Sequence, residues 1–157
     1  MKIIRLSTFL SFGGIETKMV NLSAYKDAKN EWVFAAIGKG GTAEKQILSN
    51  NKQVNVLNLD HRIPSIKTIW KLYQYLRSEK PDVLHTSGAE ANFFGFIAGK
   101  LARVPKIIVE EIGIPKQSRS AKRIFSFIFR NADYVVGESQ IVVNHIVSNY
   151  QLSLSNT

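Results

Sequence analysis

Six short, mostly apolar runs alternate with stretches of helical periodicity along the chain. The runs cover residues Ile3 to Leu6, Trp32 to Ile37, Val54 to Leu59, Val83 to His85, Lys106 to Val109 and Asp133 to Val136. Strands that alternate with helices through short turns form parallel sheets with right-handed crossovers. The pattern therefore predicts an α/β protein: a three-layer α/β/α Rossmann-like sandwich, spanning residues 1–150, with a mainly parallel sheet of about six strands.

Local signals refine this picture. The third run alternates apolar and polar residues at first, which places it nearer a sheet edge than the other runs. Pro64 is expected to open the helix that follows it. Ser87 and Glu90 fit the N-cap and N3 positions of a capping box. The helix after Glu90 carries a stripe of small residues that allows close approach to a sheet, namely Ala91, Gly95, Ala98 and Ala102.

The first strand leads into its helix through Gly13-Gly14-Ile15-Glu16. Two glycines at a helix N-terminus let backbone amides hold a phosphate or approach a substrate closely, and a tight turn explains them equally well. Glu16 is a candidate contact on the same loop, although a carboxylate in a first helical turn also stabilises the helix dipole. Neither the dinucleotide-binding nor the P-loop glycine motif is present.

Polar residues follow the fourth strand, and the carboxyl ends of parallel strands meet at one edge of a sheet. His85 is a candidate for proton transfer or for hydrogen bonding to a sugar hydroxyl or phosphate. Ser87 belongs to the same segment, and Asn92 lies one turn into the next helix, where it either reaches the crevice or is solvated. A purely structural histidine remains the alternative for His85.

Glu110 and Glu111 end the fifth strand, just before Gly113. Successive strand residues point to opposite faces, so we expect one carboxylate to face the crevice and the other to find a cationic partner. Glu111 is the candidate base, and Ser139 is expected to cap the last helix. The three histidines are scattered with no ligand spacing, so no metal site is expected.

The net charge of the 157-residue chain is +9 and it contains no cysteine. The charge favours anionic partners, and the lack of cysteine is consistent with a cytoplasmic protein. No run approaches the roughly 20 apolar residues that span a bilayer.

One segment concentrates this charge between Ile112 and Ala132. Phe125, Phe127 and Phe129 are interleaved there with basic residues, a pattern that suits either an anionic membrane surface or a solvated face over a buried one. The basic residues are Lys116, Arg119, Lys122, Arg123 and Arg130. Nucleic-acid binding is not expected, because no recognition motif is present.

Taken in order, these segments resemble the N-terminal domain of the GT-B fold glycosyltransferases of family 4. The resemblance rests on Gly13-Gly14-Ile15-Glu16, Pro81-Asp82-Val83-Leu84-His85, Ala91-Asn92, Val104-Pro105-Lys106 and Ala132-Asp133 leading to Ser139. It implies a retaining, metal-independent transfer from a nucleotide-sugar to a glycan or polyprenyl-linked acceptor at the inner membrane face. It also implies that the substrate-binding residues on the acceptor side are Gly13, Gly14, His85, Ser87 and Asn92.

The chain departs from the family pattern in two ways. Ile112 stands where members often carry a histidine before the glycine that follows the fifth strand. Residues 151–157 are the expected start of a linker to a second, donor-binding domain, so we expect the chain to be inactive alone. Two other interpretations remain open: a non-catalytic flavodoxin-like binding or signalling module, and a membrane-associated scaffold.

Overall fold

Six parallel strands form one sheet at the centre of the computed structural model, which describes residues 1–115, 117–150 and 152. The order of the strands is β3-β2-β1-β4-β5-β6, so β1 and β4 lie at the centre and β3 lies at an edge, as predicted. The strands are β1 (Lys2–Ser7), β2 (Glu31–Ala36), β3 (Gln53–Val56), β4 (Val83–Ser87), β5 (Lys106–Glu111) and β6 (Tyr134–Gly137).

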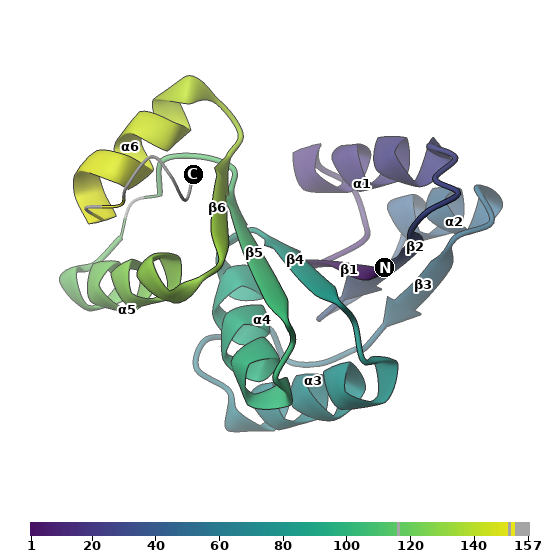
Figure 1. Ribbon diagram of the computed structural model, residues 1–157, viewed down its shortest axis with the longest axis horizontal. Coiled ribbons are helices and arrows are strands. Elements are labelled where there is room, and N and C mark those ends of the chain that lie inside the picture. Colours follow the sequence, from purple (N-terminus) through teal and green to yellow (C-terminus); the bar gives the residue numbers. More distant parts are fainter. Residues whose placement is uncertain (116, 151, 153–157) are drawn as a thin grey trace.

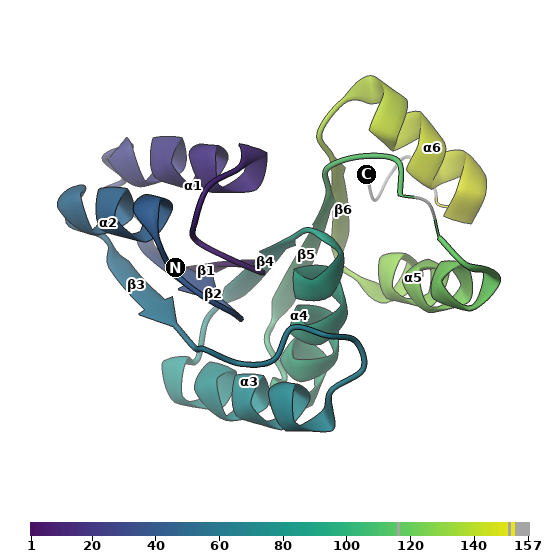
Figure 2. The same ribbon diagram turned by 180° about the vertical axis from the view of Figure 1, so that it is seen from behind.

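Six helices flank this sheet and complete the predicted three-layer sandwich (Figures 1 and 2). Helices α1 and α2 lie on one side, whereas α3, α4 and α5 lie on the other, and α6 lies beside β6 and packs on α5. The helices are α1 (Gly14–Ala24), α2 (Thr42–Ser49), α3 (Ile66–Glu79), α4 (Ala89–Ala102), α5 (Arg119–Asn131) and α6 (Gln140–Tyr150). None of the described helices is long and apolar enough to cross a bilayer.

The sheet separates two core clusters, and successive side chains of β1 point alternately to one side and the other. Ile4 and Leu6 point to the side of α3 and α4 and belong to the larger cluster. The smaller cluster lies beneath α1 and α2, around Met19 and Phe34. Arg5 and Ser7 also point to this second side, because successive strand residues alternate in direction. A charged arginine is therefore buried on the α1 side of the sheet.

Helix α4 lies close to the sheet because of its small residues. A methyl group added at Gly95 would meet Thr86 and Leu6, and one added at Gly99 would lie 2.9 Å from Ile107 Cδ1. The stripe of small residues thus has the role expected from the sequence.

Two predicted helix starts are wrong. Helix α3 begins at Ile66 with Ser65 as its N-cap, whose side chain accepts a hydrogen bond from Thr68 N, so Pro64 lies outside the helix. The N-cap of α4 is Gly88, and no side chain caps this helix. The expected capping box is absent because β4 runs on through Ser87, which makes that residue part of the strand.

Candidate functional site

A cleft of about 390 Å³ lies where β1, β4 and β5 end, and we call it the rim cleft. Its walls come from the loops that follow these three strands. In an open α/β sheet, ligands bind at the carboxyl ends of the strands, where the strand order reverses; here that point lies between β1 and β4. The lining residues are Ser7, Thr8, Phe9, Ile15, Glu16, Gly88, Ala89, Glu90, Glu111, Ile112, Gly113, Ile114 and Pro115.

Gly88 forms the corner between β4 and α4 at the edge of the rim cleft. Its φ of 90° lies in a region that side-chain-bearing residues rarely adopt, so the turn favours glycine. A Cβ atom at this position would also lie 3.2 Å from Ile15 Cδ1. The backbone conformation therefore favours glycine at this corner, and a Cβ atom would also require a small shift of the Ile15 side chain.

Glu111 is the most buried charged residue of the rim cleft, with 5% of its surface exposed. Its Oε1 accepts a hydrogen bond from Ile112 N at 3.1 Å. Its Oε2 is buried without a hydrogen-bond partner among the described residues. Burial raises the pKa of this carboxyl, against the effect of backbone amides at Ile112 and Gly113. Oε2 is therefore an acceptor without a partner in the described structure, on a residue that lines the rim cleft.

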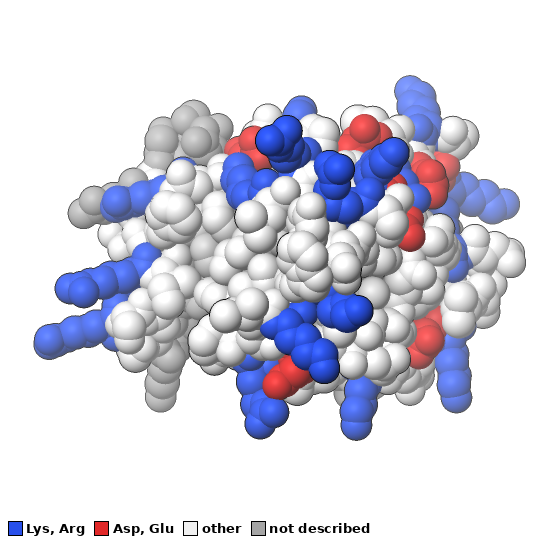
Figure 3. Space-filling view, turned by 90° about the horizontal axis from the view of Figure 1, so that it is seen from below, with Lys and Arg blue, Asp and Glu red and all other residues white. Residues whose placement is uncertain are grey.

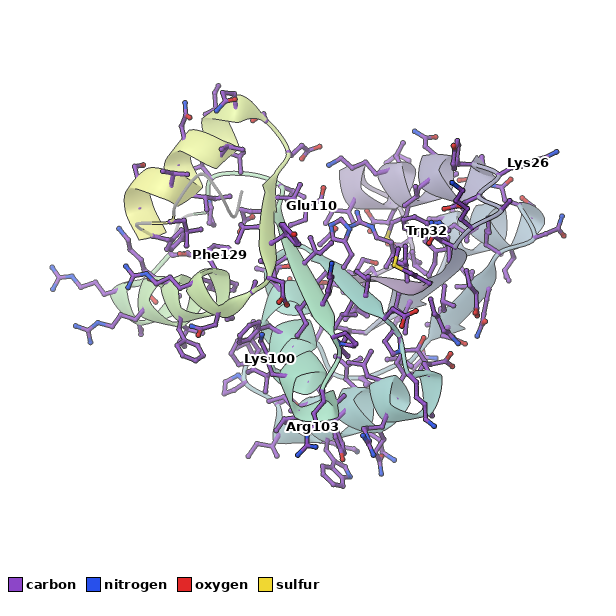
Figure 4. The ribbon with its side chains drawn as sticks, viewed as in Figure 1. Lys26, Trp32, Lys100, Arg103, Glu110 and Phe129 are labelled. Carbon is purple, nitrogen blue, oxygen red and sulfur yellow. The ribbon has the colours of Figure 1, made fainter. Side chains whose placement is uncertain are left out.

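The neighbouring Glu110 has the opposite environment, as expected from strand alternation. It lies on the α1 side of β5 (Figure 4) and accepts hydrogen bonds from Arg5 Nη2 at 2.8 Å and Lys18 Nζ at 3.1 Å. Ser87 Oγ donates a further hydrogen bond to it. Burial alone would raise the pKa of Glu110, but Arg5 and these donors lower it to about 2. Glu110 is therefore a structural anion that ties α1 to the sheet.

His85 joins this ionic cluster instead of the rim cleft, so its predicted position at the cleft is wrong. It lies in the middle of β4, opposite Arg5 in the register, and its Nε2 is 3.9 Å from Glu110 Oε2. Burial and the positive charge of Arg5 lower the pKa of His85 to about 3, although Glu110 opposes this effect. The imidazole is therefore neutral near pH 7.

Asn92 and Ser87 are also absent from the cleft lining. Asn92 is fully buried, where its Oδ1 accepts from Thr86 Oγ1 at 2.6 Å and its Nδ2 donates to the Glu110 carbonyl at 2.9 Å. Ser87 is directed at the Glu110 carboxylate. Both side chains hold β4, α4 and β5 together, so neither is solvated or available to a ligand.

The remaining predicted site residues are divided between different places. Glu16 and Gly113 line the rim cleft. Gly13 lines a neighbouring hollow of about 320 Å³ together with Glu16, and Gly14 is absent from the described lining of both. Ser139 accepts a hydrogen bond from Val142 N at 3.4 Å, which confirms it as the cap of α6 and places it outside the cleft.

Among the rim-cleft residues that sequence reasoning missed are Thr8, Phe9 and Glu90. Thr8 and Phe9 follow β1 directly, and Thr8 Oγ1 donates to Glu90 Oε2 at 3.3 Å. Glu90 was assigned to a capping box, yet it faces the cleft. The polar residue directly after the first apolar run was the available signal for Thr8.

The rim cleft is acidic. Glu16, Glu90 and Glu111 line it, and none of its described lining residues is a lysine, arginine or histidine. The arrangement suits a ligand with hydroxyl groups, which carboxylates bind as hydrogen-bond acceptors. Across the described part of the chain, no cluster of three or more His, Asp or Glu could hold a metal ion.

The basic helix predicted near residues 112–132 is α5, and its cations have different surroundings. Arg130 Nε donates to the Tyr150 carbonyl at 2.9 Å and Lys122 Nζ to Asn149 Oδ1 at 3.0 Å, so both contact α6. Arg119 and Arg123 line a surface hollow beside Lys122. Lys116 and the expected linker residues 151 and 153–157 lie outside the described residues.

Solved structures with a similar fold include three chains, two of which are named as glycosyltransferases. HepE from Anabaena, solved in complex with UDP, has a TM-score of 0.74 and 20% identity over 95% of this chain and 41% of its own. A glycosyltransferase from Rickettsia africae has a TM-score of 0.74 and 17% identity over 99% and 41% of the two chains. The lipopolysaccharide outer core galactosyltransferase WaaB has a TM-score of 0.71 and 18% identity over 99% and 44%.

The chain thus spans less than half the length of these structures, whose shared fold matches it to an N-terminal GT-B domain. No curated protein matches the chain. The family model for Glycosyltransferase Family 4 matches residues 12–156. The chain belongs to glycosyltransferase family 4.

Proposed function

We propose that this chain is the acceptor-binding half of a retaining glycosyltransferase that moves a sugar from a nucleotide-sugar to a glycan or polyprenyl-linked acceptor, as in cell-surface polysaccharide synthesis. The observation that carries the proposal is the rim cleft with its three carboxylates. The reaction is proposed to need no metal ion or other cofactor. The proposed location is the cytoplasmic side of a membrane.

The charge of the cleft favours the acceptor over the donor. A nucleotide diphosphate brings negative charges, which Glu16, Glu90 and Glu111 would repel. Sugar hydroxyls donate hydrogen bonds to carboxylates, and the apolar faces of Phe9 and Ile114 can pack against the C–H groups of a sugar ring. We therefore assign the donor to a part of the enzyme beyond this chain and expect these 157 residues alone to be inactive.

Glu111 is the proposed catalytic residue of this half. Its unpartnered Oε2 can accept the hydrogen bond of the attacking hydroxyl and then its proton. A raised pKa makes a carboxylate a better proton acceptor, and burial supplies that shift here. His85, the other candidate, is held in the Glu110 cluster away from the cleft.

The flavodoxin-like alternative is less well supported. It requires a phosphate site after β1, and the described cleft lining offers three carboxylates and no cation there. Membership of a glycosyltransferase family also favours the transferase.

The binding test compares neutral oligosaccharides with UDP by ¹⁵N NMR titration. We expect oligosaccharides to shift the amide signals of Ala89 and Gly113, and UDP to leave them unchanged. Glu111→Gln should weaken sugar binding about tenfold, because a hydrogen bond to a charged group contributes about 1.5–3 kcal/mol. Glu138→Gln is the matched control, since Glu138 lies outside the cleft lining and pairs with Lys18.

Two results would contradict the proposal. UDP binding at Ala89 and Gly113, tighter than any sugar, would assign the donor to this cleft. Sugar transfer from UDP-sugars by the 157 residues alone would show that no second half is needed.

A further inference from the structure

Five large apolar side chains are exposed on the outer faces of α3, α4 and α5. Ile66 and Trp70 on α3 are 84% and 56% exposed, and Leu101 on α4 is 57% exposed. Ile124 and Phe127 on α5 are 43% and 63% exposed. Single exposed apolar residues are ordinary, but contiguous groups of them mark interaction surfaces.

Ring contacts tie some of these exposed side chains to the packing between the helices. The Phe127 ring of α5 lies 6.1 Å from the Phe96 ring of α4 in an edge-on contact, and Lys100 Nζ lies 5.5 Å from the same Phe96 ring. On α3, Trp70 lies 5.1 Å from Tyr73, and Tyr73 packs against the core cluster that also holds α4. The five exposed apolar residues therefore lie on three helices that pack side by side, α3 against α4 and α4 against α5.

Positive charge surrounds this apolar surface. The three helices carry eight lysines and arginines against two glutamates, Glu79 and Glu90. Helices α1 and α2, on the other side of the sheet, carry two lysines and two glutamates. Figure 3 looks onto the α3–α4 side and shows lysines and arginines around an uncharged central area. Most of the net charge of +9 is thus carried by α3, α4 and α5.

We propose that this surface binds an anionic phospholipid bilayer. We call it the basic apolar face, and it consists of Ile66, Trp70, Leu101, Ile124 and Phe127 with Lys67, Lys71, Arg77, Lys100, Arg119 and Arg123. Amphipathic helices with aromatic and aliphatic side chains beside lysines and arginines lie in the membrane interface, with the apolar groups among the acyl chains and the cations at anionic headgroups.

The structure widens the membrane contact expected from the sequence and changes its members. That expectation rested on the segment from Ile112 to Ala132, in which Arg130 and Lys122 contact α6. Helices α3 and α4 supply the most exposed isoleucine, the exposed tryptophan and an exposed leucine of the face. The proposal does not depend on the chemistry of the rim cleft.

Helix α4 connects this face to the proposed acceptor site, with the cleft at its first turn and the face at its last turn. Helix α4 begins at the rim cleft, which Ala89 and Glu90 line, and carries Leu101 and Lys100 in its last turns. Figure 4 places Lys100 and Arg103 on the side of the sheet opposite Trp32. A bilayer under α4 would thus contact the element that forms one wall of the cleft.

Vesicle flotation with the 157-residue chain tests the proposal directly. We expect binding to vesicles of phosphatidylcholine with 30% phosphatidylglycerol, and at least about tenfold weaker binding to phosphatidylcholine alone, because several cations each contribute about 1 kcal/mol near an anionic surface. Raising the salt concentration to 0.5 M should release the chain, since screening shortens the range of these interactions.

Matched variants separate this face from the rest of the surface. Leu101→Ser should weaken vesicle binding several-fold, whereas Leu48→Ser on α2, where the leucine is 49% exposed, should leave it unchanged. Lys71→Glu should weaken it about tenfold, because it removes one positive charge and adds a negative one, whereas Lys45→Glu on α2 should have a much smaller effect. All four side chains are exposed, so the variants should fold, which circular dichroism checks.

Tryptophan fluorescence reports the depth of the contact. The chain has two tryptophans, and Trp32→Phe leaves Trp70 as the only emitter. We expect the Trp70 emission to shift to shorter wavelength on anionic vesicles and to be quenched by brominated acyl chains.

Three outcomes would overturn the proposal. The first is no binding to either vesicle type. The second is equal loss of binding in the variants of α2 and of the basic apolar face. The third is a concentration-dependent dimer in sedimentation that Trp70→Ser abolishes, with no vesicle binding; a second copy of the chain would then cover the face.

Discussion

Glu110 and Glu111 are adjacent residues of the same type, but they have different surroundings because successive side chains of β5 point to opposite faces of the sheet. Glu110 points to the α1 side and is neutralised by Arg5 and Lys18. Glu111 points to the rim cleft and keeps an unpartnered oxygen within the described structure. A buried carboxylate that is paired has a lowered pKa, and one that is only desolvated has a raised pKa. The first is suited to holding the fold together and the second to contacting a ligand.

His85 should make the stability of the protein depend on pH. Its pKa is about 3 in the folded chain and about 6.5 when unfolded. At pH values between these two pKa values, the unfolded chain binds more protons than the folded chain, so the free energy of unfolding rises with pH. The stabilisation from a neutral His85 is therefore lost as the pH falls below about 6.5. Between pH 7 and pH 5 the loss from His85 alone is about 2 kcal/mol.

His85→Gln removes this titration and keeps a neutral, polar side chain. We expect urea unfolding at pH 5, 6 and 7 to show that the variant loses about 2 kcal/mol less of its free energy of unfolding between pH 7 and pH 5 than the original protein does. The two other histidines are common to both proteins, so their effects cancel in the comparison. An identical loss of stability from pH 7 to pH 5 in both proteins would show that His85 is not held neutral by the fold.

Helix α4 shows how small residues let one element serve several purposes. Gly95 and Gly99 allow the helix to lie close to β1, β4 and β5, its first turn forms a wall of the rim cleft, and its last turns carry Lys100 and Leu101. Close packing fixes the position of this helix, so the cleft wall is rigidly placed relative to the strand ends.

Gly95→Ala should destabilise the protein by about 1–2 kcal/mol. The added methyl group meets Thr86 and Leu6 in a packed core, and the resulting strain exceeds the gain of about 1 kcal/mol that alanine brings to a helix. Gly14→Ala is the control, because nothing lies within 4 Å of a Cβ atom added at Gly14. Urea unfolding measures both variants, and equal stability changes would contradict close packing of α4 as the reason for glycine at position 95.

The element pattern was predictable because each buried strand is a short apolar run and each helix has an amphipathic or small-residue face. The candidate site was less predictable, because it depends on where a strand ends within one or two residues. The fourth run was expected to end near His85, but β4 continues to Ser87. This shift moves the rim to Gly88 and turns His85 and Ser87 toward the Glu110 cluster. Asn92 is buried because Thr86 and the Glu110 carbonyl satisfy its amide, a pairing that no sequence pattern indicates.

At the scale of the whole molecule, the strand order determines which parts should open first. Strands β1 and β4 have a hydrogen-bonded neighbour on both sides, whereas β3 and β6 are the two edges. Ile4 and Leu84 are fully buried, whereas Tyr134 and Val136 of β6 are 48% and 37% exposed. Local opening is least costly where few buried contacts are lost.

We therefore expect native-state hydrogen exchange to proceed from both edges inward. The amides of Ile4 and Leu84 should exchange on the order of 100-fold more slowly than those of Val54 in β3 and Val136 in β6, because central strands exchange only through near-global unfolding. Exchange followed by NMR under weakly denaturing conditions measures each amide separately. Equal protection of edge and central amides from exchange would show that the sheet opens only as one unit. The rim cleft lies at the central strands, and it would then be no more stable than β3 and β6. The expected gradient instead places the cleft on the most stable part of the sheet, where the ends of β1 and β4 keep its walls in position while the edges fluctuate.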